Sequence, residues 1–233
     1  EGLGLKATFF VVSGLIGSNE APWYDRLGRA VARLIRSGGL DEGLARAGGS
    51  LDGATERSPR GVVQAAKRLA PEVRRDFVAE MESLAGVDDS QRKMDIIMGW
   101  QELAELAHAG HEIGSHTVSH EILPSLKDQV LEREIRESKE SLESRLGASV
   151  RSFCYPNGDF DQRCLRALAA SGYSYACSTR PGDNPEGFAP FEMRRRFICE
   201  DRLQGPFGKL SPALFRLEIS GLADALFRRR KAA

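Results

Sequence analysis

The second half of the chain alternates short apolar runs with longer amphipathic runs. In the clearest amphipathic run, 128–146, Leu131, Ile135 and Leu142 recur at helical spacing and Gly147 follows as a stop. The pattern predicts helices over 100–109, 128–146 and 161–171, and strands over 5–13, 111–114, 150–155, 173–177 and 193–199. Short strands that alternate with helices of this length predict an α/β fold with a parallel sheet.

A long stretch between the first two strands, about residues 23–97, has helical periodicity instead. Four apolar residues share one face of its first helix: Leu27, Val31, Leu34 and Ile35. Pro71 opens a second helix at a first-turn position. Between the two, residues 37–60 are rich in Gly, Ser, Asp and Arg, which predicts a loop. The stretch is therefore interpreted as a helical insert in the α/β fold.

Composition and charge narrow the functional classes. Lys plus Arg equals Asp plus Glu at 33 each, so the formal net charge of the 233 residues is zero. That balance argues against a nucleic-acid binder, which usually carries a basic excess. No apolar run approaches the length of a transmembrane segment.

The cysteines bear on the redox compartment. There are four, and none forms a Cys-x-x-Cys pair: Cys154, Cys164, Cys177 and Cys199. Two lie in apolar strand-like runs, which favours buried free thiols over a disulfide. This favours a cytoplasmic location. No signal peptide is visible at the start of the chain, although a signal upstream of Glu1 would place the protein at the cell surface or outside the cell.

Candidate chemistry gathers at two histidines that follow the strand 111–114. His116 and His120 lie four residues apart in the run Gly-Ser-His-Thr-Val-Ser-His. Residues at this spacing can face one point, and neutral imidazole is a good zinc ligand. The pair also lies just past the carboxyl end of a strand, where α/β folds place their sites. A divalent-metal site with two of its usual three protein ligands is therefore predicted.

Several motifs then occur in an order that resembles a known family. Leu-Ala-x-Ala-Gly-His-Glu-Ile-Gly-Ser-His-Thr-x-x-His, at 106–120, looks like the metal-binding motif of the polysaccharide deacetylases, the NodB-type carbohydrate esterases. Phe-Cys-Tyr-Pro-Asn-Gly-Asp-Phe-Asp, at 153–161, resembles the family's next motif. Residues 5–11 resemble the strand that follows the family's first motif.

The resemblance implies a distorted TIM-like (β/α) barrel over residues 1–212, with the helical insert at about 23–97. The implied reaction is removal of N-acetyl groups from the amino sugars of a glycan, with a divalent metal, most often zinc. His116 and His120 match the metal-ligating histidines, and Thr117 matches the residue that braces their turn. Tyr155 matches the catalytic position whose backbone N–H helps to hold the oxyanion. Pro156 and Asn157, which follow it, are predicted to bind substrate.

Two departures from the family open an alternative. The family's Thr-Phe-Asp-Asp-Gly motif supplies the catalytic base and the third metal ligand, and the chain begins too late to contain it. Glu1 leads within a few residues into an apolar strand, so we expect an N-terminally incomplete barrel. No histidine follows His120, so the family's usual acid histidine is also missing. The alternative is a truncated, non-catalytic remnant that binds glycan or metal weakly.

The remaining candidates have structural interpretations. His108 and His111 flank a glycine and are expected at a helix end or on a strand. Asp161 is expected to cap a helix, and Asp159 stays open between a turn and a catalytic role. Residues 213–233 predict an amphipathic helix with a basic end. Docking of this helix on the barrel is favoured over binding to a membrane surface.

Overall fold

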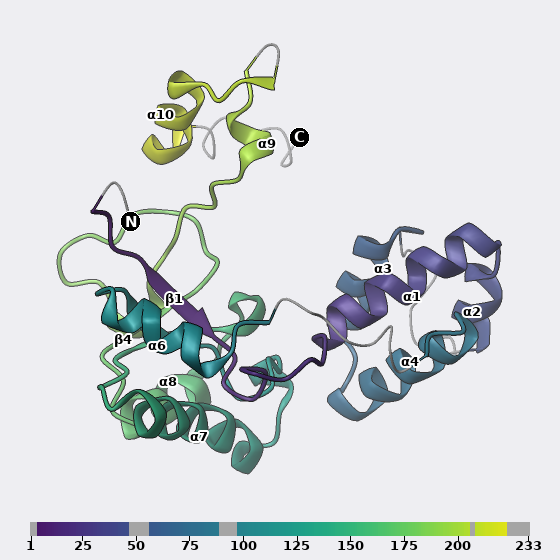
Figure 1. Ribbon diagram of the computed structural model, residues 1–233, viewed down its shortest axis with the longest axis horizontal. Coiled ribbons are helices and arrows are strands. Elements are labelled where there is room, and N and C mark those ends of the chain that lie inside the picture. The colour runs from purple at the N-terminus through teal and green to yellow at the C-terminus, as the bar shows by residue number, and fades with distance from the viewer. Residues whose placement is uncertain (1–3, 47–55, 89–96, 206–207, 223–233) are drawn as a thin grey trace.

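The computed structural model describes residues 4–46, 56–88, 97–205 and 208–222 (Figure 1). Its sheet has four parallel strands in the order β1-β2-β3-β4. The strands are β1 (Thr8–Val11), β2 (Glu112–Ser115), β3 (Ser152–Cys154) and β4 (Tyr175–Cys177). This confirms the α/β fold with a parallel sheet. Within the described ranges the strands form an open sheet and not a closed barrel, because the two outer strands, β1 and β4, do not pair with each other.

Three helices connect these strands: α6 (Trp100–His108), α7 (Asp128–Leu146) and α8 (Gln162–Ala170). Neighbouring strands are also consecutive in the chain, and crossovers between parallel strands are right-handed. The connecting helices therefore fall on one side of the sheet. There α7 contacts both α6 and α8, so the three helices form a layer (Figure 1).

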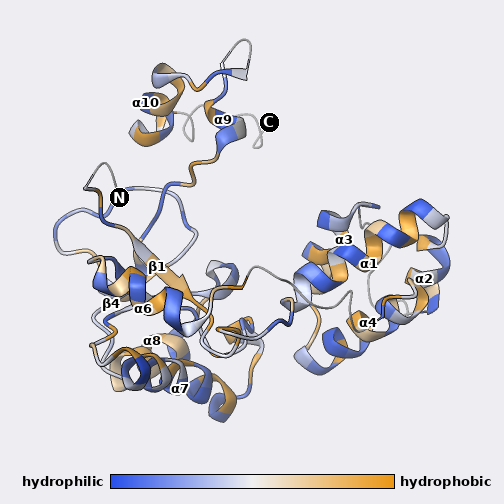
Figure 2. Ribbon diagram, viewed as in Figure 1, coloured by the Kyte–Doolittle hydropathy of each residue, from blue (hydrophilic) through white to orange (hydrophobic). Residues whose placement is uncertain are grey.

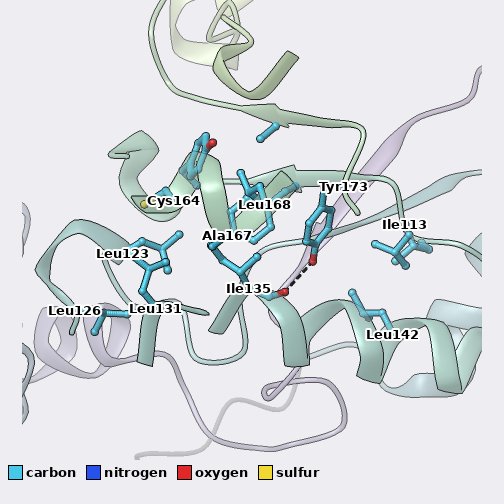
Figure 3. Packing of buried hydrophobic residues seen from close by; sticks show 14 of the residues in the cluster. Ile113, Leu123, Leu126, Leu131, Ile135, Leu142, Cys164, Ala167, Leu168 and Tyr173 are labelled. Atoms are coloured by element: carbon cyan, nitrogen blue, oxygen red, sulfur yellow. Dashed lines mark hydrogen bonds between the residues drawn. The ribbon is translucent and has the colours of Figure 1, made fainter. Parts of the chain in front are cut away.

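The main core lies between this layer and the sheet (Figure 3). Leu131, Ile135 and Leu142 are fully buried, as their helical spacing predicts. Tyr173 crosses from the strand side and donates its hydroxyl to the Ile135 carbonyl at 3.1 Å. Gly147 ends α7 with φ 62°, a left-handed conformation that costs glycine little.

The helical insert has a second core of its own. It consists of α1 (Trp23–Ser37), α2 (Leu40–Arg46), α3 (Pro59–Ala66) and α4 (Pro71–Leu84). In Figure 2, α1 and α4 each carry apolar and polar colours, as amphipathic helices do. The predicted stripe of α1 is buried except for Ile35, which is 42% exposed.

The predicted loop over 37–60 is wrong where α2 forms. Gly43 lies inside α2, and a Cβ there would come 3.2 Å from Leu34 Cδ1 and 3.4 Å from Met81 Sδ. The glycine that suggested a loop therefore permits a close helix contact. Residues 47–55 lie outside the described residues.

The predicted last strand, 193–199, is also wrong. Only Met193 forms a bridge, to Cys177. Arg194 then donates its backbone N–H to the Asn184 side chain, and Arg195 donates to the Arg180 carbonyl. Loop groups thus take the hydrogen bonds that a strand would give to β4. All four cysteines are free thiols, as predicted.

The chain continues into α9 (Glu200–Leu203) and α10 (Pro212–Ser220), which contact each other. No residue of α10 is buried, and Phe215 and Ile219 are each 43% exposed. Docking of this helix on the sheet layers is therefore not supported. The rest of the predicted terminal helix, 223–233, lies outside the described residues. In the part of the chain that is described, no helix is long and apolar enough to span a membrane.

Candidate active site at the histidine pair

The histidine turn begins where β2 ends and is tied to the end of β1. His116 donates its backbone N–H to the Val11 carbonyl at 2.9 Å, and Ser13 donates to the Thr117 carbonyl at 3.0 Å. These two bonds continue the β1–β2 ladder past its last strand residues. The turn is thus held at the carboxyl edge of the sheet, where parallel α/β folds place their ligands.

The turn has an unusual backbone. Thr117 and His120 have φ of 69° and 60°, values that residues with a side chain seldom adopt. The Thr117 hydroxyl accepts the His120 N–H at 2.9 Å, which fixes the second histidine against the first turn residue. Thr117 therefore braces the turn, as the resemblance implied. Such backbone strain persists only where the surroundings hold it in place.

Two polar residues of α7 form hydrogen bonds with the histidine turn, and neither was predicted from the sequence to contact it. The buried Glu134 carboxylate accepts the backbone N–H groups of Val118 and Ser119, both at 2.9 Å, and the Ser119 hydroxyl at 2.7 Å. The buried Ser138 hydroxyl lies 2.6 Å from the Ser115 hydroxyl and donates to the Thr117 carbonyl. The sequence does contain a signal for their burial, because Glu134 and Ser138 are polar residues at positions that fall on the apolar stripe of α7.

Replacing Glu134 with Ala is expected to lower the free energy of unfolding by about 2–3 kcal/mol. The substitution leaves the backbone N–H groups of Val118 and Ser119, both in part-buried hydrogen bonds, without their charged acceptor. Urea unfolding followed by circular dichroism measures the change. Glu132→Ala, an exposed position on the same helix, is the control and should shift stability by less than about 0.5 kcal/mol. Equal effects of the two substitutions would contradict the bracing role.

The two imidazole rings lie edge to face with their centroids 4.7 Å apart. His116 Nδ1 lies 2.5 Å from the Cys154 carbonyl oxygen. Because a carbonyl only accepts, Nδ1 carries the proton and the Nε2 lone pair is free. His120 Nδ1 is buried and has no hydrogen-bond partner among the described residues. The His120 ring packs against the Tyr24 ring, with the two ring centroids 4.9 Å apart. A buried polar atom without a partner is costly, so this nitrogen suits a ligand.

Both histidines are held neutral. Burial lowers the pKa of His116, and the nearby charge of Arg195 acts in the same direction. Burial, followed by repulsion from His116, lowers the pKa of His120 to about 4. The charges of Lys67 and Arg74 add to this effect. Neutral imidazole is the form that binds metal ions, so the pair is ready to donate at neutral pH.

The lowered pKa of His120 predicts a loss of stability in acid. Below a pH of about 6.5 the unfolded chain binds a proton at this position, whereas the folded chain binds it only near pH 4. The free energy of unfolding should therefore fall between these values, by at most about 3 kcal/mol. Urea unfolding of the metal-free protein at pH 7, 5.5 and 4.5 measures the fall. His120→Gln should flatten it, and an unchanged slope would contradict the assignment.

The described residues fit part of a metal site. Within the described ranges no cluster of three or more His, Cys, Asp or Glu side chains is placed to hold a metal ion. A catalytic zinc site usually has three protein ligands and an open position. His116 and His120 therefore supply two donors, and a third has to come from elsewhere.

The motif after β3 corrects the predicted role of Tyr155. Its backbone N–H already donates to the Cys177 carbonyl at 3.1 Å, so it is not free to hold an oxyanion. Its side chain is buried, with the hydroxyl bonded to the Phe191 carbonyl at 2.8 Å. Pro156 is also buried and shapes the turn, whereas Asn157 is exposed and can meet a ligand. Asn157 has φ 59°, and its N–H makes no hydrogen bond to the described residues.

The other candidates have structural roles. His108 is exposed at the end of α6. His111 accepts the backbone N–H of Ala7 at Nδ1, at 3.2 Å, outside the site. The Asp161 carboxylate caps α8 by accepting from the backbone of Arg163 and Cys164, as predicted. Asp159 accepts from the Asn157 amide at 2.6 Å, which places it at the rim of the site.

Known proteins resemble part of this chain. YxkH of Bacillus subtilis (strain 168), whose name places it among the polysaccharide deacetylases, is 29% identical over 108 residues. That stretch covers 46% of this chain and 39% of YxkH. The Streptococcus pyogenes deacetylase PplD, solved with acetate, is 22% identical with a TM-score of 0.42, covering 43% of this chain and 45% of PplD.

BC0361, a polysaccharide deacetylase from Bacillus cereus, is 23% identical with a TM-score of 0.39, covering 50% of this chain and 42% of that protein. The chain thus spans less than half the length of each of these three relatives. The sequence pattern of one family matches residues 1–176, which include both histidines and the motif after β3. The chain belongs to the polysaccharide deacetylase family.

Proposed function

We propose that the chain forms part of the catalytic domain of a metal-dependent enzyme that removes N-acetyl groups from amino sugars of a glycan. The observation that supports this most directly is the pair of neutral imidazoles at the carboxyl edge of the sheet. The Cys154 carbonyl fixes the tautomer of His116, and His120 has a buried nitrogen without a partner. Family membership supports the same chemistry.

The pair would hold a divalent metal, most often zinc in sites with histidine ligands. When bound, such a metal polarises the amide carbonyl and lowers the pKa of a bound water molecule. His116 would donate through Nε2, and Glu134 would keep both rings in place through the turn. Outer-shell groups of this kind orient metal ligands and tune their affinity.

The third ligand and the general base would come from a further strand beside β1. In the described part of the chain, β1 pairs only with β2, so its outer edge is open. A parallel strand at that edge would end next to Val11, whose carbonyl accepts the His116 N–H. A carboxylate at the end of such a strand would reach the histidines and would extend the sheet towards the family's barrel.

The oxyanion would need a fixed N–H donor beside the histidines. Asn157 replaces Tyr155 in this proposed role, because its N–H is unpaired among the described residues. Its left-handed backbone sets it apart from the β3 ladder that engages Tyr155. Asn157 also remains the candidate for substrate binding, since its side chain is exposed.

The alternative, a non-catalytic remnant, rests on the incomplete ligand set of the described residues. Both proposals are tested with the full-length gene product and with residues 1–233, each incubated with an N-acetylglucosamine tetramer. We expect acetate release by the full-length protein, its loss on chelation, and its return with zinc. No release by the metal-loaded protein would overturn the enzyme proposal. Release by residues 1–233 alone would overturn the remnant.

A further inference from the structure

One cation of the helical insert reaches the candidate active site. Lys67 directly follows α3 and donates from Nζ to the Asn157 side-chain oxygen at 2.7 Å. The two residues lie 90 positions apart in the sequence, and the segments that carry them pack in different cores, with Ala66 in one and Tyr155 in the other. The insert therefore extends to the rim of the site at Asn157, two residues after the buried Tyr155.

The ammonium group of Lys67 can donate further hydrogen bonds to a ligand. An ammonium carries three donor hydrogens, and Asn157 accepts one of them. Lys67 is half-buried, and no carboxylate of the described residues lies within ion-pair distance of it. Burial lowers its pKa, the like charge of Arg60 acts the same way, and Asp159 opposes both. A partly desolvated cation that forms no direct ion pair with the described residues gains from a negatively charged ligand.

The charges around the histidines are predominantly positive. Lys67 lies close enough to His120 for its charge to lower the pKa of that imidazole, and Arg195 has the same effect on His116. The nearby acids are each engaged, because Glu121 pairs with Arg74, Glu134 binds the histidine turn and Asp159 accepts the Asn157 amide. The rim therefore offers positive charge on the side of the insert and on the side of the loop after β4.

We propose that Lys67 is a substrate-binding residue that recognises an anionic group, a carboxylate or a phosphate, on the glycan. This inference rests on the proposed function and narrows its substrate class to N-acetylated glycans that carry negative charge near the acetamido group. If Lys67 only fastened the insert to Asn157, its loss would weaken every ligand alike.

Binding is measured by calorimetry at low salt with the full-length metal-free protein, so that no turnover is needed. The probes are a neutral N-acetylglucosamine tetramer, a tetramer in which N-acetylglucosamine alternates with glucuronate, and N-acetylglucosamine 6-phosphate. The variants are Lys67→Gln and Lys67→Arg, with Arg68→Gln as the control at the exposed neighbouring position. Urea unfolding checks that each variant folds as the parent does.

We expect the parent to bind a charged probe about tenfold more tightly than the neutral tetramer. Lys67→Gln should remove this preference, Lys67→Arg should keep most of it, and Arg68→Gln should leave it unchanged. The probe that shows the preference identifies carboxylate or phosphate. Parent binding without a preference, or an equal loss for all probes in Lys67→Gln, overturns the inference alone. Absence of binding to every probe overturns the proposed function and this inference with it.

Discussion

Replacing His116 with Ala in the full-length protein is expected to abolish metal-dependent acetate release and to lower zinc affinity more than about 100-fold. Outer-shell partners of metal ligands already account for 10–100-fold in affinity, and a ligand itself should exceed them. His116 is the better fixed of the two histidines, since the Cys154 carbonyl sets its tautomer. No other described His, Cys, Asp or Glu joins the pair to take its place.

Two further variants separate loss of a ligand from loss of the fold. His116→Gln retains an amide that can donate to the Cys154 carbonyl but is a poor zinc ligand, so it should fold and still lose metal. His108→Ala is the matched control, because His108 is exposed at the end of α6. Zinc titration calorimetry and acetate release provide the two readouts. Acetate release by His116→Ala within about threefold of the parent would contradict the ligand role.

Local sequence patterns were sufficient to predict the helices whose apolar residues recur at helical spacing. The predicted helix 128–146 is the observed α7, because Leu131, Ile135 and Leu142 share one face and Gly147 ends it. The position of the histidine pair was also predictable, because both residues lie in one short turn after one strand. Such features depend on neighbours within a few residues along the chain.

Contacts between distant segments were not predictable from spacing. Glu134 was not among the predicted site residues, although it accepts three hydrogen bonds from the histidine turn. The N–H of Tyr155 was expected to be free, but its partner is a carbonyl of β4. Lys67 lies in no recognisable motif, and its contact with Asn157 could not be predicted because the two residues lie 90 positions apart. These partners are known only once the strands and the insert are placed.

Replacing Arg74 with Ala is expected to lower the free energy of unfolding by about 3 kcal/mol. The Arg74 side chain is only 2% exposed and joins three segments. It forms an ion pair with Glu121, next to His120, and its guanidinium lies 4.9 Å from the Trp23 ring centroid in α1. It is thus the buried link between the insert and the histidine turn.

The loss should be large because Glu121 would stay behind without its cation. Burial already raises the pKa of Glu121, and the charge of Arg74 opposes that rise while Glu134 adds to it. Removing one partner of a buried pair leaves an uncompensated charge, whereas removing both often costs little. Arg74→Met combined with Glu121→Leu should therefore be more stable than Arg74→Ala.

The measurement uses the two tryptophans, one in each core. With Trp100 replaced by Phe, the fluorescence of Trp23 reports on the insert during urea unfolding, and circular dichroism reports on the whole chain. Arg75→Ala, an exposed neighbour, is the control and should change stability by less than about 0.5 kcal/mol. If Arg74→Ala were as mild as Arg75→Ala, the insert would be held to the histidine turn by other contacts. The tilted ring contact between Tyr24 and His120 would then be the first to test, because it joins the same two segments without charge.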